Sequence, residues 1–359
     1  LFVDGDDCIN TSEIWRALKY CDKCIDILLF RFEYLDKNIS FEEMCELKDT
    51  CIYQSKDIAK GIGNELSWEM LSCIGNKIYR RSLLAKNELK FETIYKFNED
   101  AAFAIRALMN SKKVLYSNRI IYKYRQRLGS SMNKYRKNSV FSLLTVDSLL
   151  KMYFAKSECR KEKAYYLSKK RLSTIINALN NELIYGTRRN AYAIVERLVE
   201  DEQVLDELKT VSYGNEYTVT EKIYASAIIN GEIEQVFDSA KVQSKDMLLK
   251  NWINKKIHGE NLILKIRKYG TKGISIYGAG EIGRLLAAEL DRDSVEVDYF
   301  IDFFYKGKVN GYIPCISVNE DFSKANIIIS TVLLFSEDII NFLRKKTGAK
   351  LITIWDLLI

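Results

Sequence analysis

The chain has 359 residues, of which 47% are hydrophobic and 29% charged, and its formal net charge is +7. This composition is typical of folded domains and excludes wholesale disorder, and the length allows two or three domains. No apolar run approaches the about 20 residues that span a bilayer. Lys and Arg are interspersed with Asp and Glu, which favours a solvated surface over a nucleic-acid interface.

The histidine and cysteine content limits which catalytic and metal-binding sites the chain can form. The single histidine, His258, argues against Ser-His triads and His-based metal sites. Cys21 and Cys24 form one C-x-x-C within residues 12–30, a run that we read as helical, and no second pair stands at zinc spacing. The other six cysteines are dispersed. We therefore predict that all eight are reduced thiols, with a structural metal or redox pair as the alternative. Acid–base chemistry would fall to carboxylates, tyrosines or lysines.

Residues 1–7, LFVDGDD, read as the end of a buried strand followed by a carboxylate-rich loop. Asp4 and Asp6 flank one small residue, so both carboxylates can face one point. Such hard oxygen ligands suit Mg²⁺ or Mn²⁺, especially when substrate phosphates complete the coordination. An acidic turn is the alternative, because Asp-Gly is a common turn pair.

Three further segments stand out before residue 135: NKIYRRSLL at 76–84, NEDAAFAIRAL at 98–108 and VLYSNRIIYKYRQRLGSSM at 114–132. We interpret Asn76, Lys77 and Arg80 as structural rather than catalytic. Glu99 and Asp100 open a predicted helix, where the helix dipole favours acidic side chains. Taken alone, they therefore also read as helix caps.

In their order, these segments resemble the second half of the catalytic domain of glycosyltransferase family 2, which has a GT-A fold that binds nucleotide sugars. That family carries an F-[VL]-D-x-D-D stretch, an N-K-[LI]-Y-[RK]-R-x-L-L segment, an E-D pair and a Y-x-Y-R-x-R-x-G-S run. The resemblance implies a hexosyltransferase-type enzyme of surface polysaccharide biosynthesis. It would move a sugar from a nucleotide-sugar donor to a hydroxyl of a saccharide or lipid-linked saccharide acceptor.

The resemblance also implies roles for individual residues. Asp6 and Asp4 would hold Mn²⁺ or Mg²⁺, with Asp7 among the donor contacts. The metal would neutralise charge that develops on the leaving diphosphate. Asp100, with Glu99 adjacent, would take the proton of the acceptor hydroxyl as it attacks the anomeric carbon. A single displacement of this kind inverts the anomeric configuration.

Other side chains of this region are candidates for substrate contacts. Arg125 and Arg127 offer planar donor forks to a diphosphate or an acidic acceptor, and a solvated strand edge is the alternative. Trp68 could stack on a sugar ring or lie in a core. Family members carry the nucleotide-base and ribose contacts before the D-x-D strand, and this chain begins at Leu1 without them. We therefore expect an N-terminally truncated piece that is inactive alone. We also expect a cytoplasmic protein, with peripheral association at the inner membrane face left open.

The later part of the chain changes character twice. Residues 136–270 show apolar residues at three- and four-residue spacing without proline, which predicts consecutive helices. From residue 271 strands alternate with helices, which predicts a parallel sheet covered on both faces. The predicted α/β organisation is a partial GT-A domain at 1–135, a helical region at 136–270 and a small Rossmann-like domain at 271–359.

A glycine turn marks this last domain. Gly278, Gly280 and Gly283 stand at G-x-G-x-x-G spacing between a predicted strand and helix. Such glycines allow a phosphate to approach the helix N-terminus, and Asp302 ends the next predicted strand about 20 residues on, where a ribose-binding acid falls.

The run IDFFYKGKVNGYIPCISV at 301–318 resembles small Rossmann-like modules that bind nucleotide sugars. We predict an accessory domain that binds a nucleotide or nucleotide sugar, with a degenerate scaffold as the alternative. A binding or regulatory module of this kind is the alternative function for the whole chain. A dehydrogenase ranks last, because no catalytic Tyr–Lys or His constellation accompanies the glycines.

Overall fold

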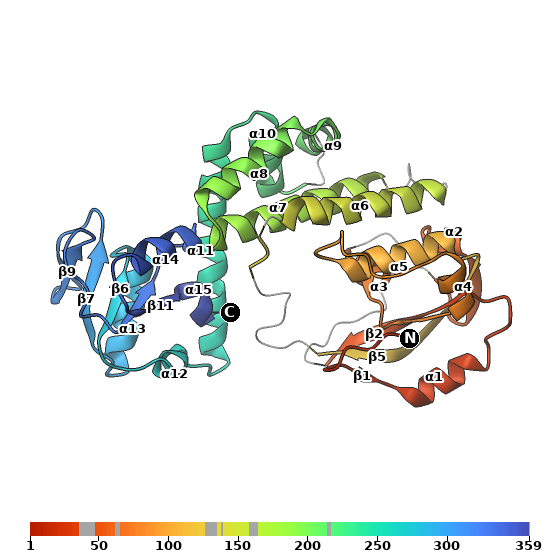
Figure 1. Cartoon of the computed structure of the whole chain (residues 1–359), viewed down its shortest axis with the longest axis horizontal. Helices are drawn as coiled ribbons and strands as arrows, with labels where there is room; N and C mark the ends of the chain where they lie inside the picture. The colour runs from red at the N-terminus through yellow and green to blue at the C-terminus, as the bar shows by residue number, and fades with distance from the viewer. Residues whose placement is uncertain are drawn as a thin grey trace. The chain divides into compact units, whose positions relative to one another are not determined.

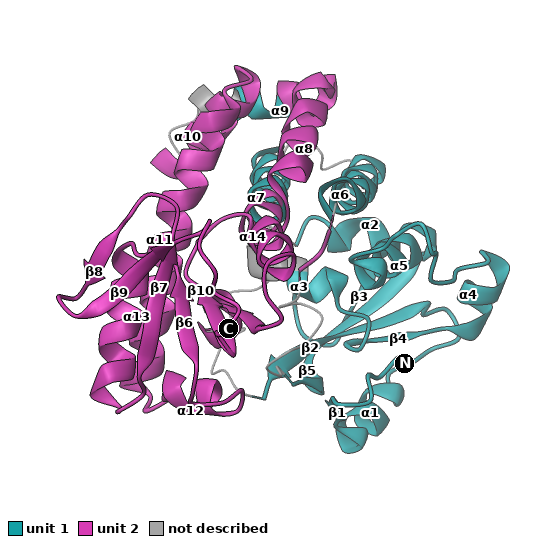
Figure 2. Ribbon diagram, turned by 60° about the vertical axis from the view of Figure 1, so that its left-hand side comes forward, with its two compact units in different colours: residues 1–134, 138–178, 207–215 teal, residues 135–137, 179–206, 216–359 magenta. Residues whose placement is uncertain are grey.

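The computed structural model describes residues 1–35, 47–61, 65–125, 135–137, 139–157, 164–213 and 217–358 (Figure 1). The chain divides into two compact units (Figure 2). Unit 1 comprises residues 1–134, 138–178 and 207–215, and unit 2 comprises residues 135–137, 179–206 and 216–359. The division falls within two helices, α7 (Ala164–Tyr185) and α9 (Glu202–Tyr213).

Unit 1 is built on a mixed five-stranded sheet in the order β1-β5-β2-β4, with β3 also paired to β5. Its strands are β1 (Cys8–Ile9), β2 (Ile27–Tyr34), β3 (Cys51–Gln54), β4 (Lys77–Tyr79) and β5 (Lys113–Tyr124). β2 runs parallel to β5, and the other pairs are antiparallel. The first part of β5 pairs with β3 and its last part pairs with β1, which brings the start of the chain to the end of β5.

Helices cover both faces of this sheet. Side chains alternate along a strand, and β2 carries apolar residues on both of its faces. Ile27 and Leu29 of β2 enter an apolar cluster that includes residues of α5 and α6. Leu28 and Phe30 enter a second cluster, which α1 covers. Figure 1 shows α1 and α5 on opposite sides of β2 and β5. The helices of unit 1 before α7 are α1 (Thr11–Leu18), α2 (Ser55–Ile58), α3 (Glu65–Ser72), α4 (Arg81–Lys86), α5 (Glu99–Asn110) and α6 (Ser139–Lys156).

A buried polar network joins α3 to the sheet, in agreement with the structural interpretation of Asn76 and Lys77. Asn76 Nδ2 donates to Phe30 O at 2.9 Å and to Met70 O at 3.1 Å. Lys77 Nζ donates to Met70 O at 2.8 Å, to Cys73 O, and to Asn76 Oδ1 at 2.8 Å. Burial lowers the pKa of Lys77 to about 7 although its ammonium N–H groups have acceptors. Together these bonds satisfy carbonyls at the C-terminal end of α3.

Replacing Asn76 with alanine is expected to lower the free energy of unfolding by about 1–3 kcal/mol, because buried Phe30 O would lose its side-chain donor. Asn87→Ala is the matched control. Asn87 Nδ2 donates to Leu83 O within the partly buried end of α4, so a loss below about 1 kcal/mol is expected there. Urea unfolding at pH 7 measures both variants, and equal losses would contradict the prediction.

In the described part of residues 136–270, the regular elements are all helices. They are α6, α7, α8 (Arg188–Glu200), α9, α10 (Val219–Ile229), α11 (Ile233–Ile257) and α12 (Leu262–Arg267). Within the ranges that the structure describes, every helix is too short or too polar to cross a membrane.

Unit 2 contains a six-stranded sheet in the order β11-β10-β6-β7-β9-β8. Its strands are β6 (Ile274–Tyr277), β7 (Val297–Asp302), β8 (Gly307–Val309), β9 (Ile313–Ser317), β10 (Ile327–Ser330) and β11 (Lys350–Thr353). Strands β11 to β9 in this order are parallel, as predicted, and only β8 at the edge is antiparallel. The helices after β6 are α13 (Glu281–Arg292), α14 (Ser336–Arg344) and α15 (Ile354–Leu358).

The predicted strand at the start of the chain is wrong. Residues 1–3 pair with no described strand, and Leu1 and Val3 are 40% and 46% exposed. Phe2 alone points into unit 1, where its ring packs edge-on against Phe103 and Phe91 at 5.3 Å. Burial of one aromatic ring therefore anchors this segment in place of strand pairing.

The helical prediction for residues 12–30 also needs correction. α1 ends at Leu18, and the apolar run from Ile27 is strand β2. A short, continuously apolar run suits either a buried helix or a buried strand. Cys21 and Cys24 consequently lie in the exposed connection as free thiols, as the other described cysteines are also free.

Two local signals in unit 2 were missed. Asn310 and Gly311 both have positive φ, at 51° and 86°, and they form the turn between β8 and β9, in which Tyr312 N donates to Val309 O at 3.3 Å. The predicted closing strand ends at Thr353, because Thr353 and Asp356 exchange hydrogen bonds that begin α15. The T-x-x-D spacing is a recognisable capping signal.

Candidate active site

The carboxylate loop at residues 4–7 lies beside the first turn of α5. The loop is a tight turn in which Asp7 N donates to Asp4 O at 3.1 Å. Phe2, just before it, packs on Phe103, which is one helical turn after Glu99. Glu99 and Asp100 are the first two residues of α5. The sequence segments that carry the predicted metal and base residues therefore meet in unit 1.

The carboxylates of the loop and of α5 repel one another, and this repulsion raises the pKa of two of them. Burial, followed by the like charges of Asp7, Asp6 and Glu99, raises the pKa of Asp4. Burial, followed by the charges of Glu99 and Asp4, raises the pKa of Asp100 to about 6. Asp4 and Asp100 are thus close enough for their charges to interact. Glu99 is exposed, whereas Asp100 is half-buried.

The end of β5 holds the carboxylate loop in place. The Tyr122 hydroxyl donates to Asp7 Oδ2 and accepts from Asp4 N at 3.5 Å. Arg125 N donates to Asp7 Oδ1 at 2.8 Å, and Arg125 Nε donates to Asp6 O at 3.1 Å. Both oxygens of Asp7 are therefore engaged within the protein. The Arg125 side chain, predicted to contact the diphosphate or acceptor, contacts the backbone of the loop.

The carboxylates suit a divalent cation that arrives with substrate phosphates. In the described ranges, no group of three or more His, Cys, Asp or Glu side chains is placed to hold a metal ion. Mg²⁺ is often bound through one or two carboxylates, with phosphates and water completing its coordination. Asp4 and Asp6 supply two carboxylates on one turn, and a cation would offset the negative charge that raises the pKa of Asp4. The residues present fit Mn²⁺ or Mg²⁺ bound jointly with a diphosphate.

Two predicted substrate contacts fall outside what the structure describes. Arg127 belongs to residues 126–134, which lie outside the described ranges. Trp68 lies in α3, but its side chain is outside the described part of the chain.

Sequence reasoning missed Tyr122 and Gly75. Tyr122 belongs to the Y-x-Y-R run, and a tyrosine is a natural neutral donor to a nearby carboxylate. Gly75 precedes Asn76 and lies against the Tyr122 ring, where a Cβ would come within 2.2 Å of Tyr122 Cε2. No local pattern reveals this contact, because it joins two segments that are distant in the sequence.

Unit 2 has the predicted strand–glycine turn–helix arrangement. Gly278 follows β6 with φ of +104°, a backbone region that favours glycine. A Cβ on Gly283 would lie 2.1 Å from Gly278 O, so glycine lets α13 pack directly on the turn. A Cβ on Gly280 would meet no atom within 4 Å. The turn is therefore open to an approaching group at Gly280.

Asp302 at the end of β7 is used by the backbone around it. Asp302 Oδ2 accepts from Ala279 N at 2.8 Å, and Oδ1 accepts from Phe304 N at 2.8 Å and from Tyr305 N at 3.0 Å. Burial opposes ionisation, but these N–H donors outweigh it and hold the pKa of Asp302 below its ordinary value. Asp302 therefore connects the glycine turn to the loop after β7. The sequence analysis predicted a ribose contact for Asp302 and did not predict this structural role.

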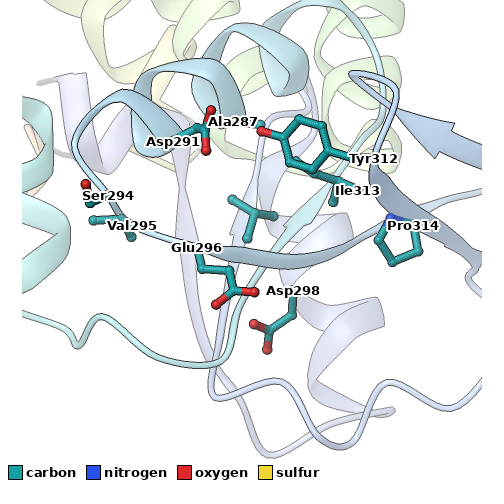
Figure 3. A pocket seen from close by; sticks show the side chains of 10 residues that line it. Ala287, Asp291, Ser294, Val295, Glu296, Asp298, Tyr312, Ile313 and Pro314 are labelled. Carbon is teal, nitrogen blue, oxygen red and sulfur yellow. The ribbon is translucent and has the colours of Figure 1, made fainter.

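A cavity of about 440 Å³ lies at the N-terminal end of β7 (Figure 3). In Figure 3 the Tyr312 hydroxyl points toward Asp291 at its rim. β6 and β7 are parallel. The cavity therefore lies at the N-terminal ends of these strands, whereas the glycine turn lies at the C-terminal end of β6. None of the predicted site residues lines it; the lining residues are Ala287, Asp291, Ser294, Val295, Glu296, Val297, Asp298, Tyr312, Ile313 and Pro314.

No protein-family model matches the chain, and no curated protein matches it. Among the solved structures to which it is similar are crystal structures of TarS from S. aureus. The first, TarS 1–349 with UDP-GlcNAc, shows 17% identity and a TM-score of 0.37 over 68% of this chain and 67% of that chain. TarS 1–349 with UDP shows 18% identity and a TM-score of 0.33 over 68% of this chain and 66% of that chain. TarS itself shows 18% identity and a TM-score of 0.37 over 67% of this chain and 39% of that chain.

The chain thus spans about two thirds of the first two solved chains and less than half of the third. At these identities and TM-scores the likeness carries no argument about function.

Proposed function

We propose that the chain is a metal-dependent, inverting glycosyltransferase of the hexosyltransferase type. Its donor is a nucleotide sugar, and its acceptor is a hydroxyl of a saccharide or lipid-linked saccharide in surface polysaccharide biosynthesis. The observation that carries the proposal is the meeting of the D-x-D-D loop with the first turn of α5. Phe2, just before the loop, packs on Phe103 at 5.3 Å. The charge of Glu99 raises the pKa of Asp4, and the charge of Asp4 raises the pKa of Asp100. Two of the segments that carry the family resemblance thereby contribute to one site.

Each residue has a defined task in this mechanism. Asp4 and Asp6 hold Mn²⁺ or Mg²⁺ together with the donor diphosphate, and the metal, when bound, neutralises charge on the leaving group. Asp100 accepts the proton of the acceptor hydroxyl, and its raised pKa makes it a stronger base than an exposed aspartate. Glu99, exposed beside it, orients the acceptor. Asp7 fixes the loop through its bonds to β5.

Binding of Mn²⁺ with inorganic pyrophosphate tests the metal and diphosphate site directly. Pyrophosphate carries the diphosphate chemistry common to nucleotide-sugar donors and needs no nucleoside contacts. The wild-type chain is expected to bind Mn²⁺ together with pyrophosphate. Asp6→Ala is expected to raise the dissociation constant at least about tenfold, which is a loss of about 1.4 kcal/mol of binding free energy. Isothermal titration calorimetry measures both.

Asp57→Ala is the matched control. Asp57 pairs with Lys60 on the surface of α2 at 3.2 Å, so its removal is expected to leave binding unchanged. Equal binding by wild type and Asp6→Ala, or no manganese-dependent binding by wild type, would contradict the metal assignment. A positive result leads to a panel of UDP-, GDP- and CDP-sugars to identify the donor.

We also propose a second candidate function, nucleotide or nucleotide-sugar binding by unit 2. The observation that favours it is the open face of the turn at Gly280, at the N-terminus of α13. Beside it, the Phe304 side chain is 96% exposed, and Asp302 fixes the backbone of both segments. A phosphate at the turn and a stacked ring on Phe304 would suit this arrangement.

A further inference from the structure

The hydroxyl of Tyr122 lies at the centre of the bonds that hold the carboxylate loop. The Tyr122 side chain is 3% exposed. Its hydroxyl bonds to the Asp7 carboxylate and to the backbone N–H of Asp4, on either side of Asp6. One buried group therefore contacts both ends of the segment that carries the two proposed metal ligands.

We propose that Tyr122 is a positioning residue that presents Asp4 and Asp6 to the metal and diphosphate, and that residue 75 is glycine to give the Tyr122 ring its place. This inference rests on the proposed function of the loop. Tyr122 contacts neither the reacting atoms nor the proposed metal in this role; it acts through the geometry of the loop.

A neutral donor suits this position. Asp4, Asp6 and Asp7 are close in sequence and repel one another, so the loop needs bonds that hold it against that repulsion. Arg125 already brings one positive charge to the loop through Asp6 O, and a lysine or arginine bonded to Asp7 in place of Tyr122 would add a second, at the expense of the charge that attracts a divalent cation. A tyrosine hydroxyl, which is neutral at ordinary pH, fixes the loop and leaves its negative charge available to the metal.

Gly75 is required by contact rather than by backbone conformation. It is absent from the glycines with positive φ, so its backbone would accept an L side chain. A Cβ there would nevertheless lie 2.2 Å from Tyr122 Cε2 and 2.3 Å from Cζ. The next residue, Asn76, is fixed by buried hydrogen bonds to Phe30 O and Met70 O. Since this segment cannot move away easily, an alanine at 75 would displace the ring and its hydroxyl.

Tyr124 provides a matched comparison. It lies two positions further on β5, on the same face of the strand as Tyr122. Its ring packs edge-on against Tyr34 at 5.6 Å. No described hydrogen bond joins its hydroxyl to the loop, whereas that of Tyr122 makes two.

The test is calorimetric titration of Mn²⁺ in the presence of inorganic pyrophosphate, at a temperature where every variant is folded. Tyr122→Phe keeps the ring and removes the hydroxyl. It is expected to weaken binding about 10- to 100-fold, the range found when a residue that orients a metal ligand is lost. Tyr124→Phe is expected to bind as wild type does. A purely structural role would lower the unfolding midpoint in chelator without changing the affinity of the folded protein.

A double-mutant cycle tests the role of Gly75. Gly75→Ala is expected to weaken binding as Tyr122→Phe does, and the two together are expected to weaken it no further, because both remove the same bonds. Additive losses in the cycle would overturn the role of Gly75. If Gly75→Ala does not fold, the comparison of Tyr122→Phe with Tyr124→Phe decides the role of Tyr122.

Asp6→Ala separates failure of this inference from failure of the proposed function. Loss of binding in Asp6→Ala with wild-type binding in Tyr122→Phe would overturn the positioning role and leave the metal site standing. Wild-type binding in Asp6→Ala, or no binding by the wild-type chain, would overturn the metal site and this inference with it.

Discussion

Replacing Asp100 with asparagine is expected to lower the rate of sugar transfer about 10²- to 10⁴-fold, the usual contribution of a positioned general base. The amide keeps the size of the side chain but cannot accept the acceptor proton. The loss is expected in kcat, since a general base accepts the proton only in the transition state. Turnover of the donor identified from the nucleotide-sugar panel measures it, in a protein that also carries the family's nucleotide-binding segment. Turnover close to that of wild type would exclude Asp100 as the base.

The pH dependence of turnover follows from the same group. Burial, Glu99 and Asp4 raise the pKa of Asp100 to about 6 in the metal-free protein. A cation on Asp4 would offset one of these charges, so activity is expected to fall as the pH is lowered through a pKa between the ordinary value of 3.8 and about 6. Glu99→Gln removes one of the like charges that raises this pKa. The acid limb of that variant is therefore expected to move to lower pH. A limb that stays in place would contradict the electrostatic link between Glu99 and Asp100.

Asp100→Asn is also expected to stabilise the metal-free protein above pH 6. The pKa of Asp100 is about 6 when folded and about 3.8 for the ordinary group, so the folded state binds more protons between these values. The free energy of unfolding contributed by the group is then highest below pH 4 and falls as the pH rises through 6. At pH 8 the variant should exceed wild type by about 1–2 kcal/mol, after discounting for solvent screening.

Urea unfolding at pH 4 and pH 8 distinguishes this result from a simple helix cap. An acidic residue that only interacts with the helix dipole would stabilise the protein, and its loss would cost about 0.3–1 kcal/mol. A stabilised Asp100→Asn variant at pH 8, with little difference at pH 4, supports the functional assignment of Asp100. A destabilised variant at pH 8 would return Asp100 to the capping interpretation.

Gly283→Ala is expected to destabilise unit 2 by about 3 kcal/mol or more, near the upper end for an overpacked site. Its Cβ would lie 2.1 Å from Gly278 O, and this oxygen belongs to the backbone of the turn. Gly278 is itself held at φ of +104°, so the turn has little freedom to move. Hydrogen exchange of β6 and β10 measures the loss of protection close to the change.

Gly280→Ala is the matched control in the same turn. Its φ of −73° suits alanine, and a Cβ would meet no atom within 4 Å. Stability should stay the same or rise by about 0.4–1 kcal/mol, because alanine restricts the unfolded chain. If a nucleotide binds at this turn, Gly280→Val should weaken its binding without unfolding unit 2. Equal destabilisation by Gly283→Ala and Gly280→Ala would contradict the packing argument.

Local patterns were sufficient for the main elements of the chain. The mixed α/β class, helix α5, the helices of residues 136–270 and the strand–turn–helix at Gly278 followed from hydrophobic periodicity and from glycine spacing. These signals act over a few residues, so they can be read without knowledge of the partner. The Asn-Gly turn at 310–311 and the Thr353–Asp356 cap were signals of the same kind that went unused.

Other errors arose where a local pattern suits two structures. The apolar run in residues 12–30 was read as one helix, whereas pairing with β4 and β5 makes its last part strand β2. Residues 1–3 resemble the end of a strand, but only Phe2 found a partner, in the aromatic cluster with Phe91 and Phe103. Contacts with distant residues decided the secondary structure of both segments.

By itself, the sequence determined that this protein has a carboxylate-rich segment at 4–7, an acidic pair at 99–100 and a glycine-rich segment at 278–283, with elements able to present them. Only the tertiary structure decided which side chains meet there. It brought Asp4 into electrostatic reach of Asp100, placed Tyr122 against Gly75 beneath the loop, and assigned Asp302 to backbone donors. The physical reason is that burial and hydrogen bonding between distant segments depend on how the sheet pairs, and no short stretch of sequence contains that information.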